Sequence, residues 1–104
     1  MTADRVDRYL KILSTTPDNH LARFGLANAY FEEGRFDLAS DEYRRCLLSQ
    51  PDWMAVHISL GHCLVRLGRV DEAREVLERA RQFAITQGHS GPQAEIAQLL
   101  SQLV

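Results

Sequence analysis

The chain has 104 residues, of which 45% are hydrophobic and 25% are charged, values that are ordinary for one soluble globular domain. Its formal net charge of −2 lacks the basic excess of a general nucleic-acid binder or of a protein that binds anionic membranes. No stretch has the length and apolar character of a signal peptide or a membrane span, so we expect a cytoplasmic protein.

The first predicted helix covers residues 3–14. Val6, Tyr9, Leu10 and Leu13 share one apolar stripe at helical spacing. The helix should end before Pro17, because the residue that precedes a proline is disfavoured in the α conformation.

Two further helices are predicted at 18–33 and 36–49. We expect the side chain of Asp18 to cap the first of them. Gly34 should end it in a left-handed conformation, which glycine adopts freely. The apolar residues of 18–33 cover more than one face, so this helix must pack on both flanks or offer one flank to a partner.

The same pattern returns 34 residues later and predicts helices at 52–67 and 70–87. Segments 17–50 and 51–84 are identical at eight positions, where about two identities would arise by chance. The identical residues that break or punctuate helices are Pro17 with Pro51, Asp18 with Asp52, and Gly34 with Gly68. A fixed period of this length indicates a repeat architecture.

A last helix is predicted at 92–103, with Ile96, Leu99 and Leu103 on one stripe and polar residues opposite. Ser90 and Gln93 fit a capping box at its start. An amphipathic terminal helix with a polar outer face suits the end of a helical solenoid.

The two 34-residue segments resemble the tetratricopeptide repeat family. The family pattern places Leu, a small residue and an aromatic on the first helix, then Ala and an aromatic on the second, and Pro at the end. The matching residues are Leu26, Ala27, Tyr30, Ala39, Tyr43 and Pro51 in the first segment, and Leu60, Gly61, Leu64, Ala73 and Leu77 in the second, where Ile85 replaces the proline. The small residues should lie where paired helices cross closely.

The resemblance implies an all-α fold, a right-handed α-α superhelix of five antiparallel helices at about 3–14, 18–33, 36–49, 52–67 and 70–87, plus a capping helix at 92–103. We expect one domain, 1–104. It would contain an orphan helix in 1–16, which is the second helix of a repeat whose first helix is missing. Repeats at 17–50 and 51–84 and a cap in 91–104 would follow.

The resemblance also implies a protein partner or peptide in a concave groove lined by the first helix of each repeat. The groove positions are Leu21, Phe24, Asn28, Phe31 and Glu32 in the first repeat, and Ala55, Ile58, Ser59, His62, Val65 and Arg66 in the second. Phe24, Phe31 and Ile58 either form its apolar floor or belong to the core. The expected function is a non-catalytic adaptor or scaffold. The alternative is a homo-oligomer, such as a weak homodimer, that uses the same apolar surface.

Some relatives of this family hold a C-terminal carboxylate with a lysine and an asparagine on the first helix. Asn28 matches that asparagine, but Phe24 stands at the lysine position and Ser59 at the asparagine position of the next repeat. This clamp is therefore not expected here.

The sequence predicts no catalytic residue, no metal site and no cofactor. His57 and His62 are five residues apart and do not share a helix face. Cys46 and Cys63 fall at small inward positions, where a reduced cysteine acts as a buried hydrophobe. No motif indicates a nucleophile with its base, or a glycine-rich phosphate loop.

Overall fold

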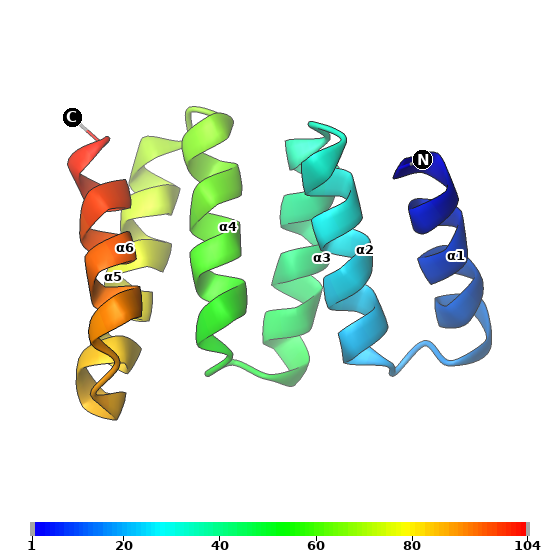
Figure 1. Ribbon diagram of the computed structural model, residues 1–104, viewed down its shortest axis with the longest axis horizontal. Coiled ribbons are helices and arrows are strands. Elements are labelled where there is room, and N and C mark those ends of the chain that lie inside the picture. The colour runs from blue at the N-terminus through cyan, green and yellow to red at the C-terminus, as the bar shows by residue number, and fades with distance from the viewer. Residues whose placement is uncertain (1, 104) are drawn as a thin grey trace. The chain divides into compact units, whose positions relative to one another are not determined.

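The computed structural model describes residues 2–103, which form six α-helices and no β-strand (Figure 1). The all-α prediction is confirmed, and the helix ends agree with the expected ones within two residues. The chain divides into two compact units, Met1–Pro51 (unit 1) and Asp52–Val104 (unit 2). The helices of unit 1 are α1 (Thr2–Thr15), α2 (His20–Glu32) and α3 (Phe36–Ser49), and those of unit 2 are α4 (Met54–Arg66), α5 (Val70–Gln87) and α6 (Ser90–Ser101).

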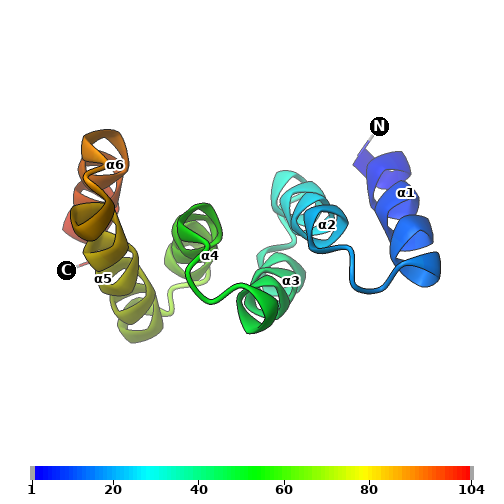
Figure 2. The ribbon, with the colours of Figure 1, turned by 90° about the horizontal axis from the view of Figure 1, so that it is seen from below.

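In unit 1, α2 packs against both α1 and α3, as Figure 2 shows. Val6 and Leu13 of α1 are buried with Leu26 of α2. Gly25 makes this approach close, because a Cβ at that position would lie 2.4 Å from Cζ of Tyr9. Leu10, expected on the same inward stripe, is instead 44% exposed. The apolar stripe that helical spacing predicts is wider than the surface that one neighbouring helix covers. Leu10 lies beyond the edge of that covered surface.

In unit 2, α5 packs against both α4 and α6. The α4–α5 crossing is close at Gly61, where an added Cβ would lie 2.4 Å from Cδ2 of the fully buried Leu77. Ala73 of α5 is also fully buried. On α6, the side chain of Ile96 is 0% exposed. The small residues of the family pattern therefore lie where paired helices meet.

Glycines end the first helix of each repeat as expected. Gly34 and Gly68 have φ values of 78° and 73°. After α2, the amide of Arg35 donates to the carbonyl of Tyr30 at 2.9 Å and the amide of Gly34 donates to that of Phe31 at 3.0 Å. This pair of bonds is the Schellman motif, which satisfies the last carbonyl groups of a helix.

Two predicted N-caps are wrong. Asn19, not Asp18, caps α2, since its Oδ1 accepts a hydrogen bond from the amide of Ala22 at 3.0 Å. The helix begins two residues later than expected, which moves the capping position past Asp18. Ser90 is already the first residue of α6, and no side chain caps that helix. The side chain of Gln93 donates instead to the carbonyl of Ala84 at 3.4 Å.

Candidate functional site

Five of the predicted groove residues lie on α2. Leu21 is 70% exposed. Phe24 is half-buried, and its ring centre lies 5.9 Å from that of Tyr43 on α3. The hydroxyl of Tyr43 also donates a hydrogen bond to Oδ1 of Asn28. The same buried tyrosine thus positions two of the predicted contact residues.

The C-terminal end of this α2 face is held by neighbours on both sides. Phe31 is half-buried and packs edge to face on Phe36 of α3, with ring centres 5.2 Å apart. Glu32 is exposed and forms an ion pair with Arg5 of α1. A ligand at Glu32 would therefore compete with Arg5.

The other six predicted groove residues lie on α4. Ile58 is only 8% exposed and belongs to the core. His62 is half-buried, and its Nε2 lies 3.2 Å from Oε2 of Glu95 on α6. The remaining four are exposed or half-buried: Ala55, Ser59, Val65 and Arg66.

The solvent side of α1 bears on the self-assembly alternative, because α1 packs on α2 and its opposite side faces solvent. Leu10 is the one large apolar side chain exposed among the described side chains of α1. Its exposed neighbours include Asp7, Arg8 and Lys11. Charged side chains around a single leucine do not favour a subunit interface, whose buried core is depleted of charge.

Both cysteines are reduced and buried. Burial raises the pKa of the Cys46 thiol to about 11 and that of the Cys63 thiol to about 12. Because the thiolate is the reactive form, neither cysteine is suited to nucleophilic chemistry near neutral pH.

Within residues 2–103, no group of three or more His, Cys, Asp or Glu side chains is arranged to hold a metal ion. None of the helices described is both long enough and apolar enough to cross a membrane.

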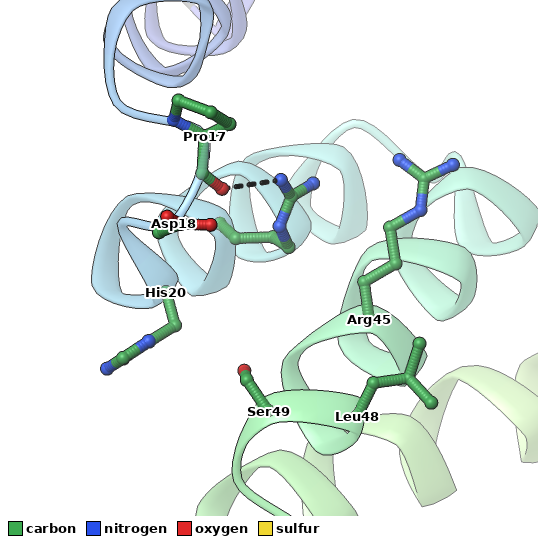
Figure 3. Close-up of a pocket in the computed structure, with 7 residues that line it drawn as sticks. Pro17, Asp18, His20, Arg45, Leu48 and Ser49 are labelled. Carbon is green, nitrogen blue, oxygen red and sulfur yellow. Dashed lines mark hydrogen bonds between the residues drawn. The ribbon is translucent and has the colours of Figure 1, made fainter.

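A pocket that the sequence did not suggest lies in unit 1, between the start of α2 and the end of α3 (Figure 3). Its volume is about 570 Å³, within the range of small-molecule ligand pockets. Its lining residues are Pro17, Asp18, His20, Arg23, Arg45, Leu48 and Ser49. None of these belongs to the predicted groove.

An ionic network holds one wall of this pocket. Nη1 of Arg23 donates to Oε1 of Glu42 at 2.8 Å. Its Nη2 donates to the carbonyl of Pro17 at 3.1 Å, the bond that is dashed in Figure 3. Nη1 of Arg45 donates to Oε2 of the same Glu42 at 3.3 Å. The Glu42 side chain is only 13% exposed, so the two guanidinium groups compensate a carboxylate that would otherwise be costly to bury.

A family model, described as tetratricopeptide repeat, matches residues 6–52 and 24–89. The chain belongs to the tetratricopeptide repeat family. Tetratricopeptide repeat domains generally mediate protein–protein interactions and are generally non-catalytic.

Two curated relatives differ greatly in length. The chain is 30% identical over 93 residues to TPR repeat-containing protein PA0015 of Pseudomonas aeruginosa, covering 89% of each protein. It is 38% identical over 73 residues to the protein CTR9 homolog of Arabidopsis thaliana, where the match takes in 69% of this chain and 7% of that protein. The chain thus spans most of the first relative and a small part of the second.

Solved structures agree on the fold. Protein BPP2914 from Bordetella parapertussis matches with a TM-score of 0.82 at 28% identity, over 94% of this chain and 85% of that one. The TPR2B domain of yeast Sti1, solved in a complex with pHsp70, matches with a TM-score of 0.88 at 18% identity, over 98% of this chain and 82% of that one. At that identity the Sti1 domain supports the fold alone.

The two tetratricopeptide repeats differ at the positions that surround the pocket. A shift of 34 residues takes Arg23 to His57 and Ser49 to Phe83. In the second repeat these two rings pack together, with centres 5.3 Å apart. The small Ser49 leaves the corresponding space of the first repeat open. Alignment of the repeats could have located the pocket, because a serine replaces a large aromatic residue at one helix-pairing position.

Proposed function

We propose that this tetratricopeptide repeat chain is a non-catalytic adaptor that binds a peptide segment of a partner protein along the first helices of its repeats, α2 and α4. The family and the fold support the general class of function. The arrangement of α2 supports the more specific proposal of peptide binding.

The single observation that carries the proposal is the fixed amide of Asn28 on an α2 face with exposed apolar surface. Leu21, Phe24 and Asn28 are spaced by three and four residues and therefore share that face. Because Oδ1 of Asn28 accepts the hydrogen bond from Tyr43, its Nδ2 group remains a donor for a peptide carbonyl. Leu21, at 70% exposure, would supply apolar contact.

The partner would differ from a chaperone tail held by its terminal carboxylate. Phe24 occupies the position of the lysine that some relatives use for that carboxylate. A partner is instead expected to present backbone carbonyl groups to Asn28 and apolar side chains to Leu21 and Phe24.

The test is affinity capture from a lysate of the native organism with a variant that alters this face without emptying the core. Leu21→Glu places a charge at an exposed apolar position. Asn28→Asp keeps an oxygen for the Tyr43 hydroxyl but removes the amide donor. Proteins retained by the parent chain and lost with the double variant would be identified, and their binding segments tested as synthetic peptides.

The control for Leu21→Glu is Ile85→Glu on α5, which likewise adds one carboxylate at an exposed apolar side chain, here 51% exposed. We expect the parent chain and this control to capture the same proteins, and all three chains to have the same helicity by circular dichroism. Unchanged capture by the double variant would contradict the assignment of peptide binding to α2.

A further inference from the structure

A polar contact between α4 and α6 reaches one of the predicted groove residues. Nε2 of His62 on α4 lies 3.2 Å from Oε2 of Glu95 on α6. An ionised carboxylate can only accept a hydrogen bond, so Nε2 carries the proton that this contact uses. Hydrogen bonds with one ionised partner are stronger than those between two neutral groups. The contact therefore restrains the orientation of the imidazole ring and keeps a proton on Nε2.

The packing of α6 places Glu95 for this contact. The next residue, Ile96, is 0% exposed, and Leu99, three residues further along the same side of the helix, is 5% exposed. Through this apolar side α6 packs in unit 2, where it contacts both α5 and α4. The side chains of Glu95 and His62 are 52% and 34% exposed. The helix is thus anchored, while the polar contact stays accessible to a ligand.

The first repeat holds the corresponding groove residue in a different way. A shift of 34 residues takes Asn28 to His62 and Tyr43 to Leu77. Tyr43 donates a hydrogen bond to Oδ1 of Asn28, whereas the side chain of Leu77 has no polar atom. In the second repeat the contact comes instead from Glu95 of the terminal helix. In both repeats a side chain from another helix therefore sets the orientation of this groove residue.

We infer that Glu95 is a positioning residue of the peptide-binding surface, so that α6 contributes to this surface in addition to α2 and α4. The inference rests on the proposed function, which places the partner segment along α2 and α4. Glu95 holds the imidazole of His62 in one orientation, in which the ring meets the peptide. Without the carboxylate the ring must be ordered when the peptide binds, and this ordering lowers the affinity.

The first experiment needs no ligand. The imidazole nitrogens of the nitrogen-15-labelled full chain are observed by NMR. Glu95→Ala should shift the ring resonances of His62, because the acceptor of its Nε2 proton is lost. The matched control is Glu75→Ala, which removes a 74% exposed carboxylate of α5 and should leave His62 unchanged. Unchanged His62 resonances in the Glu95→Ala chain would overturn the inference.

The second experiment titrates the synthetic peptide that the parent chain binds most tightly among the segments obtained by capture. Glu95→Ala should weaken its binding by about three- to tenfold, the range that one net hydrogen bond provides. Glu95→Gln keeps an acceptor oxygen and should retain most of the affinity. Glu75→Ala should bind like the parent chain. All variants should have the same helicity by circular dichroism, because each change is at an exposed position.

A double-mutant cycle shows whether Glu95 acts through His62. His62→Ala should itself weaken binding, and Glu95→Ala should then cause no further loss. Equal losses from Glu95→Ala in both backgrounds, no loss from His62→Ala, or unchanged or tighter binding by Glu95→Ala would each overturn the inference. The proposed function depends on different variants, Leu21→Glu with Asn28→Asp. Unchanged capture by that chain contradicts peptide binding at α2, whereas unchanged binding by Glu95→Ala contradicts only the role of α6.

Discussion

The close approach of α4 and α5 at Gly61 makes a quantitative prediction about stability. An alanine Cβ at position 61 would lie 2.4 Å from Cδ2 and 2.8 Å from Cγ of Leu77, whereas carbon atoms in contact are separated by about 3.5–4.0 Å. Leu77 must move by about 1 Å or more, but it is 0% exposed and cannot turn into solvent.

We expect Gly61→Ala to lower the free energy of unfolding by about 2 kcal/mol. Over-packing of a dense core costs roughly 1–3 kcal/mol, and a shift of this size in a fully buried side chain belongs at the upper end. The higher helix propensity of alanine relative to glycine offsets about 1 kcal/mol of this cost. With a urea m-value of about 2 kcal/mol/M, the unfolding midpoint should fall by about 1 M.

Urea unfolding followed by circular dichroism measures this change, and a double-mutant cycle tests its cause. In a Leu77→Ala background the clash is absent, so Gly61→Ala should become stabilising by up to about 1 kcal/mol. A control at the equivalent position of the first repeat, Ala27→Gly, should destabilise by about 1 kcal/mol, the loss of helix propensity. A single Gly61→Ala variant more stable than the parent chain would refute the close approach.

Three further predictions follow from the core, the turns and the cysteines. Leu26→Ala and Leu60→Ala, at sites that are each 1% exposed, should each cost about 2–5 kcal/mol in urea unfolding; near-zero costs at both would contradict their burial. Gly34→Val should destabilise by about 1–3 kcal/mol, because a β-branched residue resists the φ of 78°; an unchanged thermal midpoint would contradict the left-handed turn. The pKa values of Cys46 and Cys63 are raised to about 11 and about 12, against an ordinary 9.0. Above pH 9 the folded chain therefore retains thiol protons that the unfolded chain releases. The contribution of these thiols to stability is complete below pH 9 and falls as the pH rises toward 11 and 12. Cys46→Ala with Cys63→Ala should weaken that alkaline loss in unfolding scans, and rapid alkylation of the folded parent chain at pH 8 would contradict the burial of the thiols.

Apolar spacing and the 34-residue period alone determined where the helices lie. The 34-residue spacing from Gly34 to Gly68 predicts where helices end, because only glycine adopts the left-handed turn without strain. The small residues Ala27 and Gly61 mark the helix crossings, because a larger side chain there would hold the helices apart. The helix-ending glycines and the small residues at the crossings act locally or recur at a fixed spacing. They can therefore be recognised in the sequence of a single chain.

Only the tertiary structure decided which side chains remain exposed and what they contact. The apolar pattern did not distinguish Ile58, which is buried, from Leu21, which is exposed, since that depends on how far the neighbouring helices reach. The pocket depends on Arg23, Glu42 and Pro17, which come together only when α2 and α3 pair. Its open space exists because Ser49 stands where Phe83 packs on His57 in the second repeat. A volume left unfilled between two helices is a property of their packing, not of either helix alone.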